Sequence, residues 1–319
     1  MLELIIFALC LVCFTATYYL VGKIAEHNKK IGIRGIDINK AHKPALPEST
    51  GIALLFPLWL VAVSIFIIEK DTAFIAWAVM ISGFSLVGYA DDMKHKTTAK
   101  AIPWRIRAAI IGVISLLFSF IFFGNNLLLV VLAALYLAGI ASFENTFAGL
   151  NGVEAGSGLI ILVFVSLVVF STTGKTIVFL AALPLIVSIL AFLIYNKYPA
   201  KVFPGDSGTL LIGSAIAGLV IMQQSFPLMI LTFLFFIPHM IDFALKMITN
   251  PKDPSQKKEL PYVLNSDGTL DVPQSRKLDF AKMLLLIFGP KREPIVVAMM
   301  LTCVILNCAF WYVLFFIIV

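Results

Sequence analysis

The strongest constraint on this chain is a series of ten apolar runs, each close to the length that crosses a lipid bilayer. They cover residues 2–22, 50–68, 72–90, 106–123, 126–141, 157–173, 176–195, 207–223, 226–246 and 294–318. A helix needs about 20 apolar residues to cross the hydrocarbon core. Apolar residues make up 60% of the composition and charged residues 13%, against about 45–50% and about 25% in soluble domains. The sequence therefore predicts an all-α polytopic membrane protein of about ten transmembrane helices, with residues 1–319 forming one domain.

The charged residues predict how this bundle is oriented. In the ten-helix arrangement, 22 of the 24 lysines and arginines lie in odd-numbered connections, and only Lys70 and Lys175 lie in even-numbered ones. Because cytoplasmic connections are enriched in positive charge, we expect the odd-numbered connections in the cytoplasm and both termini outside. The net charge of +6 suits anionic membrane lipid and a polyanionic substrate equally well. No nucleic-acid partner is expected.

Polar residues gather at four places on the predicted cytoplasmic side. The four segments are "KAHKPALPESTG" (40–51), "GYADDMKHKTTAK" (88–100), "SFENTFAGLNGVEAGSG" (142–158) and "VFPGDSGTLLIG" (202–213). In the first, Lys43 is a candidate phosphate contact. Glu48 is an acid beside an apolar run, a position that needs a partner. The alternative is a basic loop flanking the membrane, with Ser49 or Thr50 capping the next helix.

The second segment places Asp91 and Asp92 at the end of the third apolar run. A helix C-terminus disfavours negative charge, and adjacent carboxylates repel one another. The pair therefore needs a cation or an acid–base role. The alternative is simple neutralisation by nearby lysines, which are Lys94, Lys96 and Lys100.

The third and fourth segments combine oxygen ligands with glycines. Asn145 and Asn151 offer amide oxygens to a hard cation or amide groups to a sugar, although a glycine-rich turn would have the same composition. Asp206 stands at a helix N-terminus between Gly205 and Gly208. It is either a helix cap or a Mg²⁺ ligand beside glycines that let a phosphate approach the backbone. Together the four segments predict a site for Mg²⁺ and a phosphorylated substrate.

The order of the motifs resembles one enzyme family. P-E-S-x-G, A-D-D, N-x-x-A-G-x-N-G-x-E-A-G and F-x-G-D-S-G follow one another as in the polyprenyl-phosphate N-acetylhexosamine-1-phosphate transferases. The third motif has Ala148 and Asn151 where bacterial members carry D-G-x-D-G, which makes it similar to the eukaryotic and archaeal UDP-N-acetylglucosamine–dolichyl-phosphate N-acetylglucosamine-1-phosphotransferases.

This resemblance implies a reaction and a location. N-acetylglucosamine-1-phosphate would pass from UDP-N-acetylglucosamine to a polyprenyl phosphate, dolichyl phosphate above all, with release of UMP. That is the first step of lipid-linked oligosaccharide assembly for N-glycosylation. The active site would be cytoplasmic, in the cell membrane of an archaeon or the endoplasmic reticulum membrane of a eukaryote.

The resemblance also implies roles for individual residues. It assigns Mg²⁺, for which Mn²⁺ would substitute, to Asn145 and Asp206. It assigns the acceptor phosphate and catalysis to Asp91, Asp92 and Lys100. The residues expected to bind substrate are Lys43, Glu48, Asn151, Gly205, Lys257 and Lys258. The family's first asparagine falls on Ser142, so the role of Ser142 stays open, as does that of Glu144.

The last cytoplasmic connection, 247–293, is long enough to contribute to the site. "LPYVLNSDGTLDVP" predicts a β-hairpin, and "KLDFAKMLLLIFG" is too short to span and predicts an interfacial amphipathic helix. The dolichol branch carries an R-H-R-I-P-R-like cluster in this connection. Its counterpart is "KKELP", from Lys257 to Pro261, a poor match, so Arg276 is a further candidate for binding pyrophosphate.

Three alternatives stay open at this point. An enzyme of the same type would use undecaprenyl phosphate or another UDP-sugar for envelope polymers. A secondary transporter would place coupling acids near the bilayer midplane, whereas the acids here cluster at the ends of the apolar runs. A homodimer is compatible with the sequence, which does not determine the oligomeric state.

Overall fold

The computed structural model describes residues 2–98, 100–147, 149–249, 262–273 and 277–318. Each apolar run is helical, the ninth as two helices. The helices of these runs are α1 (Leu2–Ile31), α2 (Leu55–Glu69), α3 (Ala73–Thr98), α4 (Trp104–Phe123), α5 (Leu127–Thr146), α6 (Val153–Thr173), α7 (Ile177–Asn196), α8 (Gly205–Ile221), α9 (Phe226–Phe235), α10 (Ile237–Ile248) and α12 (Glu293–Ile318).

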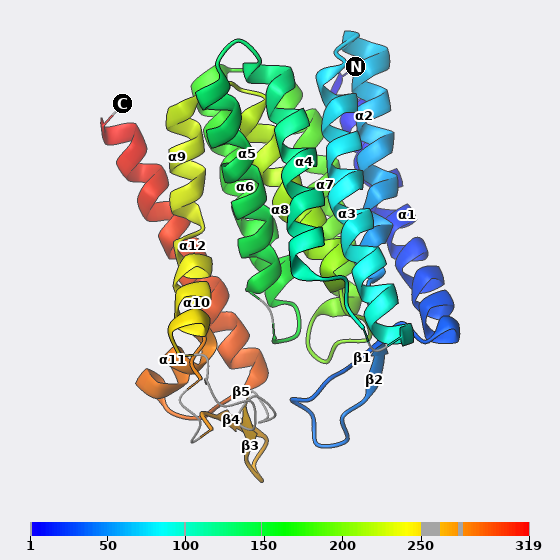
Figure 1. The fold of residues 1–319 in the computed structure, drawn as a ribbon, viewed down its shortest axis with the longest axis vertical. Helices are drawn as coiled ribbons and strands as arrows, with labels where there is room; N and C mark the ends of the chain where they lie inside the picture. Colours follow the sequence, from blue (N-terminus) through cyan, green and yellow to red (C-terminus); the bar gives the residue numbers. More distant parts are fainter. Residues whose placement is uncertain (1, 99, 148, 250–261, 274–276, 319) are drawn as a thin grey trace.

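The number of helices able to span a membrane is smaller than the number of runs. Among the described residues, seven helices are long and apolar enough, or eight if α9 and α10 form one bent span. The remaining apolar segments, Leu180–Asn196 and Gly205–Ile221, are shorter. The structure thus confirms a helical protein with seven or eight membrane-capable helices. The ten-span count and the orientation with both termini outside stay predictions, although Figure 1 places both termini at one end of the bundle.

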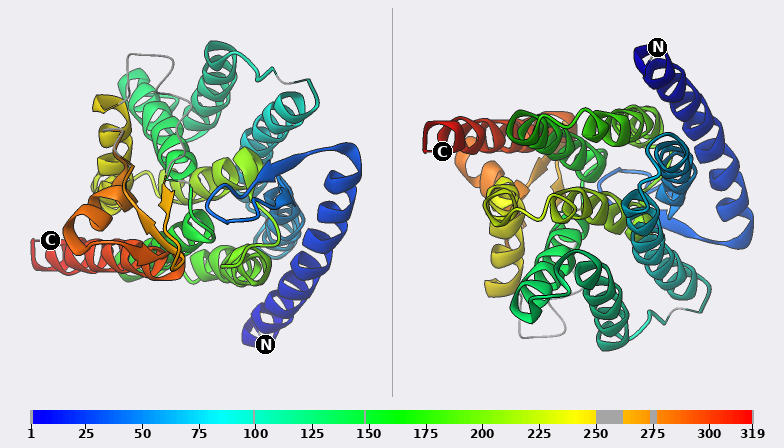
Figure 2. Two further views of the ribbon diagram at one scale, coloured as in Figure 1. Left: turned by 90° about the horizontal axis from the view of Figure 1, so that it is seen from below. Right: turned by 90° about the horizontal axis from the view of Figure 1, so that it is seen from above.

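The short helix α8 forms the centre of the bundle. It packs against α3, α5 and α6, and every residue from Ser207 to Ile221 is buried. Figure 2, seen along the bundle, shows α8 in yellow-green with the other helices around it. Glycines allow this close packing, because a Cβ at Gly218 would lie 2.5 Å from the Trp77 ring on α3. A helix that is apolar on every side and surrounded by other helices is buried in protein. It therefore need not be long enough to cross the bilayer.

The ninth run is broken at Phe236, where α9 and α10 meet at an angle of 60°. Pro238, in the first turn of α10, lacks an N–H and its ring collides with the carbonyl four residues earlier, so a straight helix cannot continue through it. The carbonyls of Leu234 and Phe235 accept hydrogen bonds from Asn307 Nδ2 of α12, at 3.0 and 2.9 Å. Backbone groups freed at this depth need such partners.

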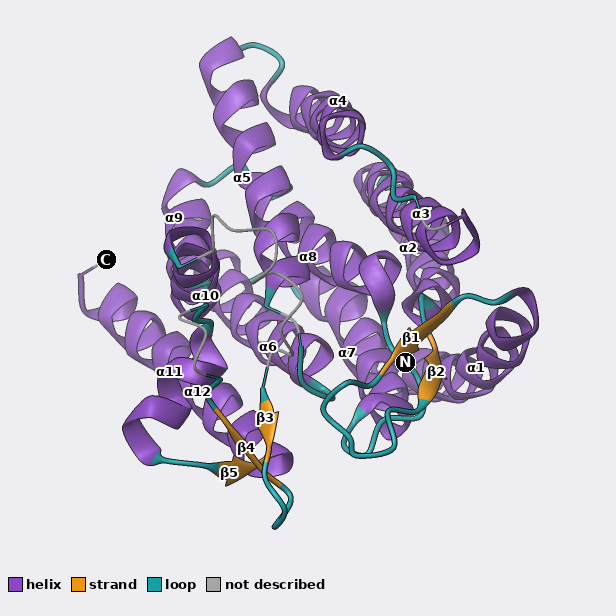
Figure 3. Cartoon of the chain, turned by 60° about the horizontal axis from the view of Figure 1, so that its bottom comes forward, coloured by secondary structure: helices purple, strands orange, loops and turns teal. Residues whose placement is uncertain are grey.

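Two small antiparallel sheets lie at the end of the bundle opposite the termini (Figure 1), and Figure 3 shows their strands in orange. One pairs β1 (Arg34–Ile36) with β2 (Ala45–Pro47), just before the 3₁₀ helix η1 (Thr50–Leu54). The other has the order β3 (Val263–Leu264), β4 (Thr269–Asp271) and β5 (Lys291–Arg292). The predicted hairpin is therefore present, with β5 as an unpredicted third strand. The predicted short helix is α11 (Phe280–Phe288); its interfacial position stays a prediction.

Candidate active site

A cavity of about 270 Å³ opens at the end of the bundle that carries the sheets. Its walls come from the loop after β1, the ends of α5 and α7, and the beginnings of α6 and α8. The predicted site residues that line it are Glu48, Asn145, Asn151, Gly205 and Asp206. Three of the four predicted segments thus meet around one space.

The predicted acid Asp91 lies beside this cavity, joined to it by Arg107. Asp91 accepts hydrogen bonds from the Ile102 N–H at 2.6 Å and from Arg107 Nη1 at 2.7 Å. The same Arg107 nitrogen also pairs with Asp206 Oδ2, at 2.5 Å. Arg107 therefore places one positive charge between two carboxylates, one from α3 and one from α8. In the sequence, Arg107 is one of several basic residues at the start of the fourth apolar run, and it belongs to none of the motifs.

The second predicted acid, Asp92, is buried and is held by the residue after Glu48. Its Oδ2 accepts a hydrogen bond from Ser49 Oγ at 2.7 Å, and the hydroxyls of Ser49 and Ser207 lie 2.9 Å apart. The Ser49 side chain does not cap η1. It orients Asp92 instead of acting as the helix cap that the sequence also allowed. Gly205 is needed here, because a Cβ on it would lie 2.4 Å from Asp92 Oδ2.

The two predicted metal ligands face each other across the ends of α5 and α8. The Asn145 and Asp206 side chains both line the cavity, and Asn145 Oδ1 accepts a hydrogen bond from Thr209 Oγ1 of α8 at 2.6 Å. Pro204 is the N-cap position of α8, without a side-chain cap, so Asp206 does not act as the cap. In the described part of the chain no three His, Cys, Asp or Glu side chains form a metal-binding group. Mg²⁺ needs only one or two protein oxygens when phosphates complete its shell, so this pair fits it.

A second polar cluster, here called the rim, adjoins the cavity; its members Asp37 and Asn151 line the cavity, whereas Lys40 and Glu293 lie behind them. Lys40 pairs with Asp37 at 3.2 Å and with Glu293 at the start of α12. Asn151 uses its side chain within the protein: Nδ2 donates to Asp37 at 3.2 Å, and Oδ1 accepts from the Ala200 N–H at 3.0 Å. Asn151 therefore joins two loops at the cavity. Glu293 was identifiable in principle, because it is an acid at the edge of an apolar run, as Glu48 is.

Other predicted residues lie apart from the cavity. Lys43 and Lys100 are exposed and do not line it. Glu48, by contrast, lines the cavity and pairs with Lys96 at 2.7 Å. The Ser142 hydroxyl donates to Ala138 O within its own helix. Positions outside the described residues are Ala148, Lys257, Lys258 and Arg276.

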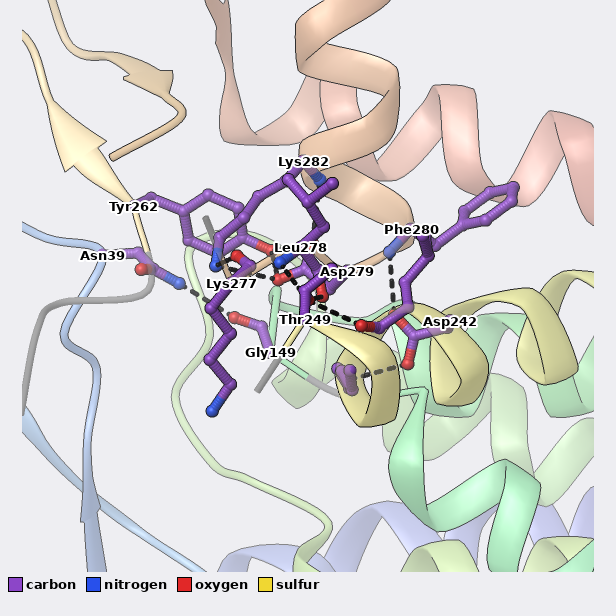
Figure 4. A network of polar contacts seen from close by, with 12 residues as sticks. Asn39, Gly149, Asp242, Thr249, Tyr262, Lys277, Leu278, Asp279, Phe280 and Lys282 are labelled. Atoms are coloured by element: carbon purple, nitrogen blue, oxygen red, sulfur yellow. Dashed lines mark hydrogen bonds and ion pairs between the residues drawn. The ribbon is translucent and has the colours of Figure 1, made fainter. Parts of the chain in front are cut away.

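The connection after α10 carries a buried polar network (Figure 4). The Tyr262 hydroxyl donates to Asp279, at 3.3 Å, and Lys282 pairs with the same carboxylate, at 3.4 Å. Burial, followed by the charge of Asp279, raises the pKa of Tyr262 well above its ordinary value. Burial lowers the pKa of Lys282 although Asp279 opposes the shift.

The Asn39 amide, in the loop after β1, donates to Gly149 O at 2.8 Å.

Comparison with known proteins agrees with this geometry. Residues 74–224 match the family model described as glycosyl transferase family 4. A protein of Methanocaldococcus jannaschii provisionally named a glycosyltransferase is 32% identical over 274 residues, covering 82% of this chain and 80% of that protein. The chain belongs to glycosyl transferase family 4.

Further members of glycosyl transferase family 4 narrow the chemistry. A Saccharolobus solfataricus protein is 31% identical over 76% of this chain and 78% of its own length, and is provisionally named a UDP-N-acetylglucosamine–dolichyl-phosphate N-acetylglucosaminephosphotransferase. The phospho-N-acetylmuramoyl-pentapeptide-transferase of Carboxydothermus hydrogenoformans is 24% identical over 65% of this chain and 71% of its own. The chain is therefore a membrane-embedded phosphoglycosyl transferase, of a family that uses nucleotide sugars and polyprenyl phosphates.

Within this member of glycosyl transferase family 4, the matched segment contains the polar centre of the site. Asp91, Arg107 and Asp206 all fall inside residues 74–224. The rim residues Lys40 and Glu293 fall outside it. Asp37 and Glu48, which line the cavity, also fall outside it, so the match to the family covers only part of the cavity lining.

Proposed function

We propose that this protein transfers N-acetylglucosamine-1-phosphate from UDP-N-acetylglucosamine to a polyprenyl phosphate, with dolichyl phosphate as the acceptor. UMP is the second product, and the step begins lipid-linked oligosaccharide assembly for N-glycosylation. One observation supports it most: Asp91, Asp206 and Asn145 meet beside a cavity at one end of an apolar bundle. A lipid phosphate and a water-soluble sugar nucleotide can both reach that place. The names of archaeal relatives support the choice of sugar and lipid.

The chemistry follows from the groups present. An oxygen of the acceptor phosphate attacks the β-phosphorus of the sugar nucleotide, and the bond from that phosphorus to the bridging oxygen breaks, so that UMP leaves. A phosphate monoester has its second pKa near about 6, so it is mostly dianionic at neutral pH and needs little help from a base. Asp91 and Asp92 orient the acceptor or take its remaining proton. Arg107 holds a positive charge where negative charge gathers.

The cofactor of the proposed reaction is Mg²⁺, with Mn²⁺ as a substitute. Asn145 and Asp206 would hold it, and when bound it neutralises the charge of the pyrophosphate. The remaining residues act directly: Ser49 fixes the Asp92 carboxylate, and Gly205 leaves space for it. We propose that the cavity faces the cytoplasm, and the positive-inside pattern of the lysines and arginines supports this orientation.

A direct assay tests the proposal. Purified protein is incubated with Mg²⁺, labelled UDP-N-acetylglucosamine and dolichyl phosphate, and both labelled lipid and UMP are measured. We expect both products in equal amounts and none from Asp206→Ala. If neither product forms with any of several UDP-sugars and polyprenols, the transferase hypothesis is wrong. If the protein prefers undecaprenyl phosphate or another UDP-sugar, the proposed substrates are wrong and the proposed reaction type is right.

A further inference from the structure

Glu144 is an acid that the proposed chemistry leaves without a role. It lies on α5 one residue before Asn145 and is fully buried. Its Oε2 is 3.3 Å from Nε2 of His239 on α10, which is also fully buried. Small residues make room for it, because a Cβ at Gly158 would lie 2.8 Å from Glu144 Oε1 and a Cβ at Gly213 would lie 2.9 Å from the Glu144 Cβ. The acid is thus enclosed by α6, α8 and α10.

The same helix α10 also contacts the residue on the other side of Asn145. Lys246 Nζ donates to the backbone carbonyl of Thr146, at 2.5 Å, and α5 ends at Thr146. The last carbonyls of a helix lack partners within it, and a lysine there also faces the negative end of the helix dipole. The His239 ring packs on Phe147, with ring centroids 4.0 Å apart. Helix α10 therefore holds the chain on both sides of Asn145.

Helix α10 is in turn fixed by the connection that follows it. Asp242 pairs with Lys246 at 2.7 Å and accepts the N–H of Phe280, the first residue of α11, at 2.9 Å (Figure 4). At the end of α10, Thr249 Oγ1 accepts the N–H of Leu278 at 2.7 Å. A continuous series of contacts thus joins the segment around α11 to the end of α5.

We propose that α10 positions the Asn145 amide for the divalent cation through two contacts, Glu144 with His239 and Lys246 with the Thr146 carbonyl. The inference rests on the proposed function, in which Asn145 is a metal ligand. Stability is a weak explanation for these two side chains, since burying polar groups without hydrogen bonds costs free energy, and neither the Glu144 carboxyl oxygens nor the His239 ring nitrogens have a hydrogen-bond partner in the described part of the chain. Groups that orient metal ligands, by contrast, change metal affinity by about 10–100-fold when removed.

The test measures metal binding without turnover. Mn²⁺ is added to the purified protein in the absence of substrates, and the free ion is followed by its electron paramagnetic resonance signal. We expect the Mn²⁺ dissociation constant to rise about tenfold in Glu144→Ala and in Lys246→Met. Glu144→Gln, which keeps an oxygen facing His239, should stay close to wild type. Matched controls are Glu26→Ala and Lys23→Met, which make the same two substitutions in an exposed pair on α1.

Two comparisons make the outcome decisive. Wild-type Mn²⁺ affinity in folded Lys246→Met would overturn the inference, and the Lys246 side chain is 28% exposed, so this variant tests it even if Glu144→Ala does not fold. Asn145→Ala and Asp206→Ala separate the two proposals. If neither weakens Mn²⁺ binding, the metal assignment in the proposed function fails. If both weaken it while Lys246→Met does not, only the positioning role fails.

Discussion

Replacing Gly205 by alanine should reduce turnover through one displaced carboxylate. Gly205 has a φ of +65°, and a Cβ on it would lie 2.4 Å from Asp92 Oδ2 and 2.6 Å from Ser49 Cα. An ordinary contact begins at 3.4 Å, so the carboxylate must move by about 1 Å. A misplacement of about 1 Å at a reacting group can cost about 100-fold in rate, which equals about 2.7 kcal/mol of activation free energy.

The control separates this displacement from backbone strain. Gly174, which follows the far end of α6, has nearly the same φ, +66°, and a Cβ added there would meet nothing within 4 Å. Both alanine variants bear the strain of a left-handed residue, about 1–2 kcal/mol. In an assay of UMP release with both substrates saturating, kcat should fall about 100-fold in Gly205→Ala and stay near wild type in Gly174→Ala. Equal kcat values for the two folded variants would refute the reasoning.

Three further predictions follow from the site and the network behind it. Arg107→Met should lower kcat by about 100-fold or more because Asp91 and Asp206 lose their shared cation; Arg107→Lys should recover part of the loss, and full activity in Arg107→Met would contradict the role. Removing divalent cations with EDTA should abolish UMP release, and Mg²⁺ or Mn²⁺ should restore it in wild type but not in Asp206→Ala. Burial lowers the pKa of Lys282 in the folded state, so a protonated Lys282 reduces the free energy of unfolding. This loss of stability is complete below the folded-state pKa, and it disappears as pH rises towards the ordinary value of 10.5. The Tm of wild type relative to Lys282→Met should therefore rise between neutral pH and about pH 10.5, and a flat difference would argue against a lowered pKa.

The apolar runs predicted the helices well, since lipid and a buried bundle both demand long apolar segments with satisfied backbones. They could not predict the break at Phe236. Pro238 is compatible with a kink as well as a full break, and the partner that satisfies the freed carbonyls is Asn307, some 70 residues later. The requirement of about 20 apolar residues for a membrane span does not apply to α8, because that helix is surrounded by protein and not by lipid.

The candidate site was predictable where a residue type was unusual for its position. Asp91, Asn145 and Asp206 are polar residues at the ends of apolar helices. Because each helix crosses the bundle once, counting helices between these residues shows that they lie at the same end. Arg107 could not be distinguished from other flanking basic residues, because its two partners depend on how α3, α4 and α8 pack. Lys100 was expected at the acceptor phosphate from the family resemblance; it is exposed and does not line the cavity, and its role stays a prediction.

The bend in the ninth run and the rim of the cavity are joined by one uninterrupted helix. Glu293 begins α12 at the rim, and Asn307 holds the bend 14 residues later, a rise of about 21 Å. One residue inserted between them would rotate one contact by about 100° relative to the other, so that Glu293 and Asn307 could not both keep their partners. Beyond Asn307 the same helix makes neither contact. Length variation in this protein should therefore be tolerated after Asn307 and not before it.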